Sequence, residues 1–291
     1  MFRGSIVALI TPFYEGEVDY TALRSIIDWH VEQGTHAIVP VGTTGESPTL
    51  THDEHVAIIK AVVDQVAGRI PVIAGAGSNN VVEAIEYTQH AEEVGADGTL
   101  HVAGYYNRPN QRGLLAHFSA INDAATRPVI LYNIPPRAVV NIEPQTMAEL
   151  AKLPRICGVK DATGDLARPW IERQLIDSAD FFWLSGEDAT AVAYNISGGQ
   201  GCISVTANIA PKLCAQMQQA CLDGRWEQAV ALQDRLMPLH QAMFIEPSPA
   251  GVKYAASLLN LCSAQCRLPI VELADETKRR IEQAMQQLEL I

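Results

Sequence analysis

One lysine of this sequence stands at the end of an apolar run that otherwise has the composition of a buried strand. Lys160 follows residues 156–159 and precedes Asp161 in the stretch "ICGVKDATGD". Burying an ammonium group is unfavourable unless the group is paired or loses its proton, and a lysine attacks a carbonyl carbon only as the neutral amine. Lys160 therefore either forms a Schiff base with a carbonyl substrate or serves as an anion-binding or ion-paired residue, with Asp161 as one partner. The pattern alone leaves both alternatives open.

Hydroxyl side chains and one arginine follow other apolar runs in the same way. A carbinolamine forms and loses water only if protons move at one oxygen, and a tyrosine paired with a threonine can relay these protons. Tyr132 has packing as its alternative role, and the two threonines of "TTG" could instead cap the following helix. The backbone N–H groups of "TTG" also suit a carboxylate. The candidates of this kind are Thr43, Thr44, Tyr106, Tyr132, Arg137 and Lys160.

Arg137 follows a double proline that fixes its loop. A guanidinium group held in this way can clamp a carboxylate or a phosphate. The alternative is an ordinary surface arginine, and the residue type does not decide between the two.

Other kinds of chemistry lack their characteristic residues. No pair of carboxylates dominates the candidates, no histidine cluster has metal-ligand spacing, and no serine lies in a nucleophile-elbow context. The six cysteines are expected to be reduced, because none has C-x-x-C spacing. Cys262 and Cys266 could share one helical face, but no nearby histidine completes a metal site. We therefore expect neither a metal ion nor a separate cofactor.

The composition narrows the class of protein further. The net charge of −12 over 291 residues argues against nucleic acid or an anionic membrane surface as a partner. An apolar fraction of 48% supports a large core. No apolar run approaches the roughly 18 residues of a membrane span, and the N-terminus lacks the features of a signal peptide. These observations predict a cytoplasmic protein.

Short β-rich runs recur along the chain, and each is followed by an amphipathic helical stretch. Continuous apolarity, as in "PVILY", is typical of strands covered on both faces, and helical connections imply parallel pairing. Eight such units favour an α/β fold with a (β/α)8 TIM barrel over an open sheet. The runs begin at Ser5, His36, Ile70, Gly98, Pro128, Ile156, Phe181 and Gly201.

The last part of the chain contains helical patterns only. We therefore predict a catalytic barrel over residues 1–225 and a C-terminal helical appendage over residues 226–291, whose apolar faces pack on the barrel or on another subunit. Active sites of such barrels lie at the C-terminal ends of the strands. The candidate residues named above stand at these ends.

Four segments together form a strong family signature: "VGTTGES", "GYYNRPNQRGL", "YNIPPRA" and "GVKDATGD". With them the sequence resembles the bacterial dihydrodipicolinate synthase family, within the pyruvate-dependent class I aldolases, over nearly the whole chain. The resemblance implies a lyase that condenses pyruvate with L-aspartate 4-semialdehyde through a Schiff base on Lys160. The product would be 4-hydroxy-tetrahydrodipicolinate, on the route to diaminopimelate and lysine.

The resemblance also assigns roles to the other candidates. Tyr132 matches a proton donor and acceptor that is linked through Thr43 to Tyr106, which a neighbouring subunit contributes. A homotetramer built from dimers is therefore implied. Thr44 matches a residue that holds the pyruvate carboxylate, and Arg137 matches the arginine that positions the semialdehyde carboxylate. The substrate-binding positions carried over are Thr44, Arg137, Gly186 and Ile203.

A second site is implied near the start of the helix after "VGTTGES". His52 and His55 are three residues apart and share a helical face. By residue type alone they are either solvated first-turn histidines or ligands of a metal that would need a further partner. The resemblance implies instead an interface site for the inhibitor L-lysine, with Glu83 facing its ammonium group. The matching residues are Ser47, Pro48, His52, His55, Asn79, Glu83 and Tyr105.

Three other functions remain as alternatives at this point. The first is a pyruvate-dependent aldolase or hydratase with a different acceptor aldehyde. The second is a noncatalytic barrel that binds pyruvate or amino acids as a sensor or interaction module. The third, a phosphate-binding barrel, lacks a glycine-rich phosphate loop after the last two strands.

Overall fold

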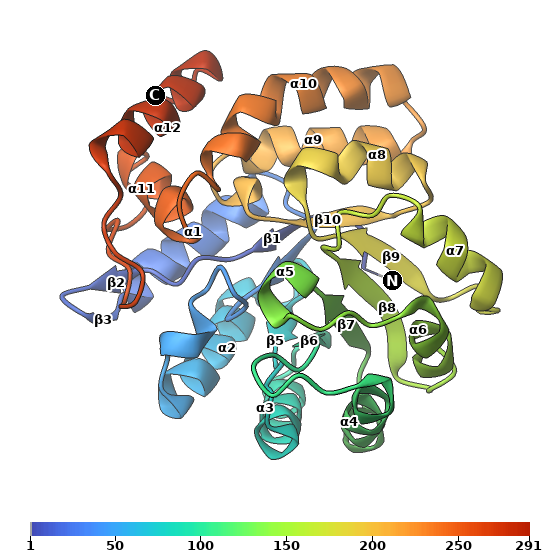
Figure 1. Cartoon of the computed structure of the whole chain (residues 1–291). Coiled ribbons are helices and arrows are strands. Elements are labelled where there is room, and N and C mark those ends of the chain that lie inside the picture. The colour runs from blue at the N-terminus through green and yellow to red at the C-terminus, as the bar shows by residue number, and fades with distance from the viewer. Residues whose placement is uncertain (1) are drawn as a thin grey trace.

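Parallel strands form a barrel at the centre of the molecule (Figure 1). The computed structural model describes residues 2–291. Eight strands pair in the order β4-β1-β10-β9-β8-β7-β6-β5, and a parallel bridge between Ile38 and Val72 joins the two ends. The strands are β1 (Gly4–Ala8), β4 (Ala37–Val39), β5 (Ile73–Gly75), β6 (Gly98–Val102), β7 (Val129–Asn133), β8 (Ile156–Asp161), β9 (Phe182–Ser185) and β10 (Gly201–Ser204). Each overlaps one of the runs singled out from the sequence, and the predicted barrel is confirmed.

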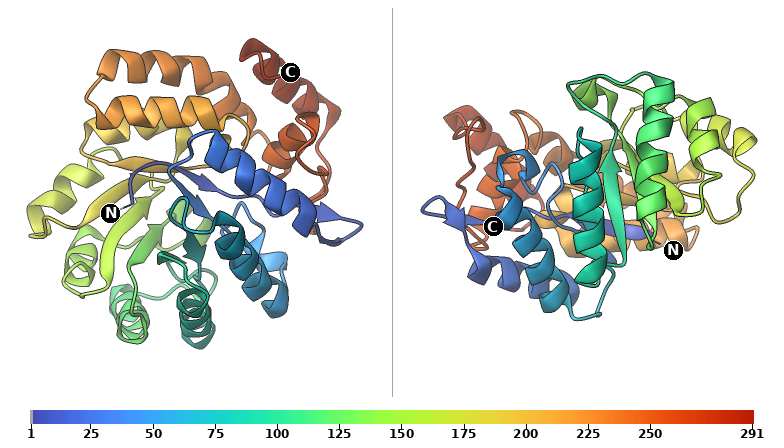
Figure 2. Two further views of the ribbon diagram at one scale, coloured as in Figure 1. Left: turned by 180° about the vertical axis from the view of Figure 1, so that it is seen from behind. Right: turned by 90° about the horizontal axis from the view of Figure 1, so that it is seen from below.

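Helices surround the barrel, as the views in Figure 2 show. They are α1 (Tyr20–Glu32), α2 (His52–Val66), α3 (Val81–Glu93), α4 (Gln111–Ala124), α5 (Pro135–Ala138), α6 (Pro144–Leu150), α7 (Arg168–Leu175), α8 (Ala191–Ile196) and α9 (Pro211–Leu222), with short 3-10 helices η1 (Ser47–Thr49), η2 (Asp188–Thr190) and η3 (Thr206–Asn208). Thr51 and Glu54 form a capping box that starts α2. No helix within residues 2–291 combines the length and apolarity needed to cross a membrane.

The interior of the barrel is an apolar cluster built from alternate residues of the strands. Its members include Ile6, Ala8, Val39, Ile73, Leu100, Ile130, Tyr132, Leu184 and Ile203. The strand register pairs Lys160 of β8 with Tyr132 of β7 on one side and with Leu184 of β9 on the other. Because side chains alternate between the two faces of a strand, this register places Lys160 among the inward-facing residues at the C-terminal end of β8.

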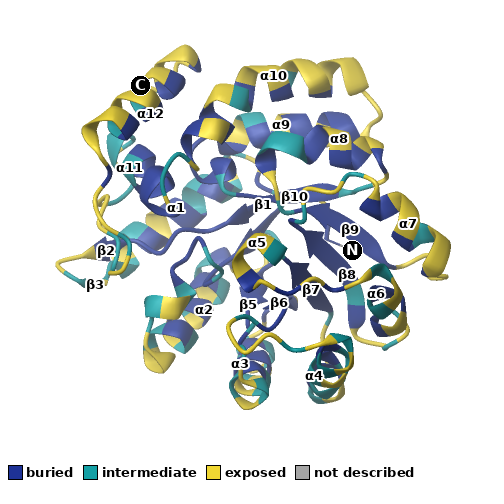
Figure 3. Cartoon of the chain, viewed as in Figure 1, coloured by how far each residue is buried: buried dark blue, intermediate teal, exposed yellow. Residues whose placement is uncertain are grey.

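Three further helices follow the barrel: α10 (Trp226–Ala242), α11 (Ala250–Leu258) and α12 (Asp275–Gln287). Their apolar faces join the layer between the barrel and its helices, where Leu236 and Ile281 share one buried cluster with Met217 of α9. Figure 3 shows these buried faces turned toward the rest of the chain. The C-terminal helices therefore pack on the barrel of their own chain. The division into two units at residue 225 stays a prediction.

One small element was not predicted. Strands β2 (Phe13–Tyr14) and β3 (Glu17–Val18) form an antiparallel hairpin between β1 and α1. In Figure 1 it lies beside the C-terminal segment, where the Gly16 N–H donates to Gln265 (3.2 Å). The hairpin thus connects the segment between β1 and α1 with the segment between α11 and α12.

Candidate active site

Lys160 is buried at the mouth of the barrel, with 7% of its surface exposed. Its Nζ lies 4.1 Å from the centre of the Tyr132 ring. Within residues 2–291 no carboxylate forms an ion pair with this lysine, and no side chain or carbonyl accepts a hydrogen bond from it. Asp161 faces away and accepts a hydrogen bond from the hydroxyl of Tyr194 (3.3 Å). An ion pair between Lys160 and Asp161, one of the alternatives left open by the sequence, is therefore wrong.

Gly186 leaves room for the lysine stem. A Cβ at this position would lie 3.1 Å from Cε of Lys160 and 2.9 Å from Cβ of Ala162. Both separations are shorter than ordinary van der Waals contact. The Gly186 N–H also donates to the carbonyl of Asp161 (2.6 Å), which fixes the β9 end against β8. Ile203, the other predicted lining residue, is a buried member of the barrel interior.

Thr43 and Thr44 lie in the loop between β4 and η1. Thr44 is buried, and the loop closes on itself through a hydrogen bond from the Glu46 N–H to the Thr43 carbonyl (3.1 Å). Thr11 of the loop after β1 donates its hydroxyl proton to the Gly45 carbonyl (2.7 Å). Because Thr51 caps α2, neither threonine is a helix cap, and that alternative is wrong.

Tyr106 and Arg137 do not join this cluster within one chain. Tyr106 is 91% exposed and has a φ of 65°, in the left-handed region. Arg137 is exposed on the last turn of α5, above the end of β7. The chain thus brings Lys160, Tyr132, Gly186 and Ile203 together, and leaves Tyr106 and Arg137 on its surface.

Comparison with known proteins decides the family. Residues 1–288 match the family model described as the Dihydrodipicolinate synthetase family. The chain belongs to this family. It is 58% identical over 282 residues, 97% of each chain, to the 4-hydroxy-tetrahydrodipicolinate synthase of Roseobacter denitrificans, and 57% identical over the whole of both chains to that of Ruegeria pomeroyi. The predicted family, and the prediction of an enzyme of the lyase class, are confirmed.

Solved structures of dihydrodipicolinate synthases have the same fold. The structure from Aquifex aeolicus gives a TM-score of 0.97 at 42% identity over 99% of both chains. The chloride-inhibited synthase from Acinetobacter baumannii, complexed with pyruvate, gives 0.97 at 41% identity over the whole of both chains. The synthase from Cyanidioschyzon merolae with lysine bound gives 0.96 at 38% identity, over 100% of this chain and 99% of that one.

A buried polar network supports the strand end that carries the lysine in this family member. The Arg168 guanidinium lies 3.9 Å from Asp161 and donates to Glu172 (2.8 Å). Glu172 also accepts from the indole N–H of Trp183 (2.8 Å). Burial raises the pKa of both Asp161 and Glu172, and the positive charge of Arg168 opposes that rise. The network fixes Asp161, and with it the direction in which Lys160 points.

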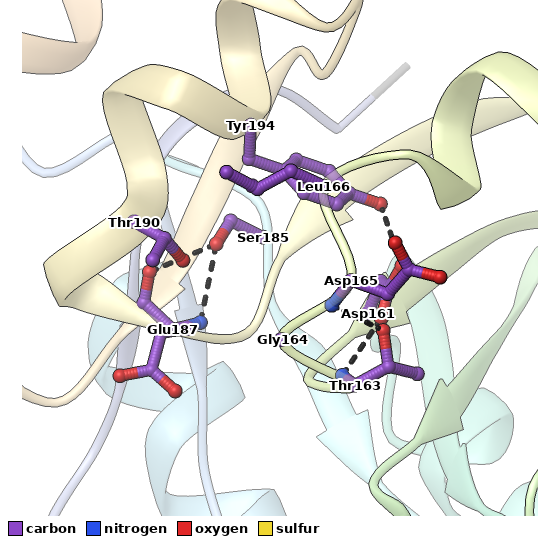
Figure 4. Close-up of a pocket in the computed structure, with 9 residues that line it drawn as sticks. All are labelled: Asp161, Thr163, Gly164, Asp165, Leu166, Ser185, Glu187, Thr190 and Tyr194. Atoms are coloured by element: carbon purple, nitrogen blue, oxygen red, sulfur yellow. Dashed lines mark hydrogen bonds between the residues drawn. The ribbon is translucent and has the colours of Figure 1, made fainter.

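A small pocket lies beside Asp161, between the loop after β8 and the start of α8 (Figure 4). It is lined by Asp161, Thr163, Gly164, Asp165, Leu166, Ser185, Glu187, Thr190 and Tyr194. Its free volume of about 10 Å³ matches a single water molecule. The pocket is therefore too small for a keto acid, and it does not replace the barrel mouth as the substrate site.

The predicted lysine-site residues come from α2, α3 and neighbouring loops. The side-chain amide of Asn79 donates to the Tyr105 carbonyl (3.3 Å), and the Ser78 hydroxyl donates to Glu83 (2.5 Å). Ser47 and Pro48 open η1, directly before α2. These contacts join the loop before α3 to the loop after β6.

The two histidines of this site differ in their surroundings. His52 is exposed, whereas His55 is buried against the ring of Tyr87, with 3.8 Å between the ring centres. Burial, followed by the charges of neighbouring histidines, lowers the pKa of His55 to about 4. The alternative of two solvated first-turn histidines therefore holds for His52 only. Tyr87 was missed in the sequence because a tyrosine on an amphipathic helix carries no specific signal.

Lys253 was also missed. The sequence places it at a helix start and gives no reason to single it out, yet its side chain is completely buried in α11. The pattern that singles out Lys160, a lysine in an otherwise apolar segment, could also have indicated Lys253. The helix "AGVKYAASLL" contains no other charged residue, so its lysine stands alone in an apolar segment.

Proposed function

We propose that this chain condenses pyruvate with L-aspartate 4-semialdehyde through an imine between C2 of pyruvate and Nζ of Lys160. The observation that carries the proposal is the buried Lys160, which has no partner within residues 2–291 except the face of Tyr132. An amine that is held in a barrel mouth without a counter-charge is disposed to act as a nucleophile. The names of the relatives and the pyruvate complex of the Acinetobacter baumannii synthase support the same substrate.

The proposed reaction begins when neutral Nζ of Lys160 adds to the keto carbon of pyruvate. The resulting carbinolamine loses one water to give the imine, and a proton leaves the methyl carbon to give the enamine. The enamine carbon then attacks the aldehyde of the second substrate. The amino group of that substrate finally attacks the imine carbon and releases Lys160 with the cyclic product. Tyr132, whose ring lies beside this amine, would supply the hydroxyl for these proton transfers.

The remaining residues are proposed to bind and orient the substrates. Thr44 and the backbone N–H groups of its loop would hold the pyruvate carboxylate, because donors grouped in this way suit an anion. Arg137 would hold the semialdehyde carboxylate at the pocket entrance. No separate cofactor takes part in this scheme, since the covalent intermediate is formed with the substrate itself. Gly186 and Ile203 would line the pocket around the imine.

We further propose that the working enzyme is a homotetramer built from dimers. The high exposure and left-handed backbone of Tyr106 are costly features for a side chain with no function. Both are accounted for if Tyr106 extends into the site of a neighbouring subunit, where Thr43 would link it to Tyr132. Dilution should then reduce specific activity as dimers separate.

Regulation by L-lysine is proposed for the site that comprises Ser47, Pro48, His52, His55, Asn79, Glu83 and Tyr105. Glu83 offers a carboxylate for an ammonium group, and the lysine-bound synthase from Cyanidioschyzon merolae supports lysine as a ligand of this family's fold. The site lies at the start of α2, a few residues after the loop of Thr43 and Thr44. Binding there would be transmitted to the active-site loop through this short segment.

The decisive test is borohydride reduction of the full-length protein with and without pyruvate, followed by intact mass and peptide mapping. A pyruvate-dependent adduct on Lys160 is the expected result. Lys160→Arg should abolish the adduct. Lys152→Arg, the same substitution at an exposed lysine, should leave it unchanged. A folded wild-type protein without an adduct would overturn the proposal.

The alternative of a different acceptor needs a separate measurement. Turnover of several aldehydes at one fixed pyruvate concentration distinguishes the two functions, because only the acceptor changes. L-aspartate 4-semialdehyde should give the largest kcat/KM. If a different aldehyde were preferred, the alternative aldolase or hydratase would replace the synthase.

A further inference from the structure

A second buried lysine forms an ion pair across the molecule. Lys253 of α11 is 0% exposed, and its Nζ lies 2.8 Å from Oε1 of Glu46, which is itself 3% exposed. The two residues are 207 positions apart. Removing one partner from a buried pair leaves an uncompensated charge, which is far more unfavourable than losing an exposed pair. The position of Glu46 therefore depends on Lys253.

The pair belongs to a cluster with balanced charge. The Arg267 backbone N–H donates to the other oxygen of Glu46 (2.8 Å), and its guanidinium binds Glu54 through two hydrogen bonds (2.6 and 2.7 Å). Lys253 Nζ lies 4.1 Å and the Arg267 guanidinium 4.3 Å from the centre of the Phe13 ring. Two carboxylates thus balance two cations around one aromatic ring, with the Lys253–Glu46 pair buried and the Arg267–Glu54 pair partly exposed.

Glu46 is an integral part of the loop that carries the candidate threonines. Its φ of 57° is in the left-handed region, which is unfavourable for a residue with a Cβ. Its N–H donates to the Thr43 carbonyl, and its carbonyl accepts from the N–H of Thr49 (2.9 Å). A residue in this conformation keeps it only when its surroundings enforce it. Here the enforcing contacts come from Lys253 and the backbone of Arg267.

We propose that Lys253 and Glu46 are positioning residues, which hold the loop of Thr43 and Thr44 in the shape that receives the pyruvate carboxylate. The inference rests on the proposed function, because it assumes that this loop binds pyruvate. Neither side chain touches the substrate. Their effect is exerted through the backbone between residues 43 and 46, where the Glu46 N–H meets the Thr43 carbonyl.

The test compares pyruvate binding in wild type and Lys253→Met, which removes the charge and keeps most of the side-chain length. The yield of borohydride-trapped adduct is titrated against pyruvate concentration, and kcat and KM are measured in parallel. A misplaced loop should lose one hydrogen bond to the pyruvate carboxylate. Loss of one such bond to a charged group corresponds to a rise of about tenfold in the pyruvate Kd and KM. The kcat at saturating pyruvate should stay near the wild-type value, since Lys160 and Tyr132 are untouched.

Ile281→Ala is the matched control. It creates a cavity in the same C-terminal helices and lowers stability, but Ile281 is a member of the apolar cluster and not one of the charged residues or Phe13. Its pyruvate KM should equal that of wild type. If Ile281→Ala and Lys253→Met raised KM equally, the effect would be a general loss of stability, and the positioning role would be wrong.

A second variant provides the test if Lys253→Met does not fold. Glu46→Gln keeps the size of the side chain and removes its charge, and it should give the same selective rise in pyruvate KM. If the folded variant has an unchanged pyruvate KM, the positioning role is wrong. The proposed function still stands in that case, provided that the wild-type protein forms the adduct. A wild-type protein that forms no adduct overturns both.

Discussion

Lys160 and Tyr132 are direct partners across neighbouring parallel strands, and the amine of the first lies 4.1 Å from the ring centre of the second. The ring therefore covers one side of the amine. A carbonyl substrate would meet both groups together.

Tyr132→Phe should separate the two functions of the tyrosine. The ring that supports Lys160 remains, whereas the hydroxyl proposed to move protons is lost. We expect kcat to fall by about 10² to 10⁴, the usual contribution of a general acid or base, with unfolding by urea unchanged. Steady-state kinetics and urea titration of the same preparation provide the check. A kcat close to that of wild type would assign proton transfer to another group.

Gly186→Ala should displace the lysine. Its Cβ would lie 2.9 Å from Cβ of Ala162 and 3.1 Å from Cε of Lys160, so the lysine stem or its strand must shift. A shift of the nucleophile by about 1 Å is enough to reduce the rate about 10²-fold. The rate of imine formation with pyruvate, followed by borohydride trapping over time, measures this effect. Trapping at the wild-type rate would show that the lysine stem has free space.

Glu83→Thr should weaken inhibition by L-lysine and leave turnover intact. The substitution removes the carboxylate proposed to face the ammonium group of the ligand. We expect the inhibitory concentration to rise by about tenfold or more, as for the loss of one charge-assisted contact. Glu86→Thr, at an exposed glutamate of the same helix, is the control and should change nothing. Wild-type activity that is unaffected by millimolar lysine would remove the regulatory site.

Acid should destabilise the fold through buried histidines. Burial lowers the pKa of His30 and His101 to about 3 and that of His55 to about 4. In the unfolded chain a histidine titrates near 6.5. Between these values the unfolded state binds more protons than the folded one. The free energy of unfolding therefore has its full value above pH 6.5 and decreases as the pH falls below it.

The size of this effect can be measured for one residue at a time. Between pH 7.5 and pH 5.0 each of the three histidines should cost about 2 kcal/mol, at 1.36 kcal/mol per pH unit below 6.5. Urea titrations at both pH values give the loss, and His101→Gln should reduce it by the contribution of that one histidine, about 2 kcal/mol. His52→Gln, at an exposed site, should leave it unchanged. Equal stability at both pH values would contradict the buried neutral state.

The barrel was predictable because its strands are covered on both faces. Continuous apolar runs such as "PVILY" then mark each strand, and the parallel pairing follows from the helices between them. The hairpin of β2 and β3 was not predicted, because two residues per strand are too few to show a periodic pattern of apolar residues. The register that places Lys160 opposite Tyr132 also required the structure, since a shift of one residue reverses the face of every side chain.

The candidate site was predictable only as far as strand ends reveal it. Lys160 and Tyr132 are each the last residue but one of their strands, and both lie where the sequence indicates. Lys253 is in a helix, its partner Glu46 is 207 residues away, and no local pattern relates them. Tyr87 likewise meets His55 only because α2 and α3 pack together. Contacts between distant segments are set by the whole fold, and a local pattern does not contain them.

The distance in sequence between Glu46 and Lys253 also sets an order of events during synthesis. A ribosome that has made Glu46 must add 207 more residues before Lys253 exists, which takes about 10 to 40 s at 5–20 residues per second. Throughout this time Glu46 lacks the ammonium group that it pairs with in the folded chain. All eight barrel strands are made before Lys253, and the loop of the two threonines can reach its final shape only after α11 has been made.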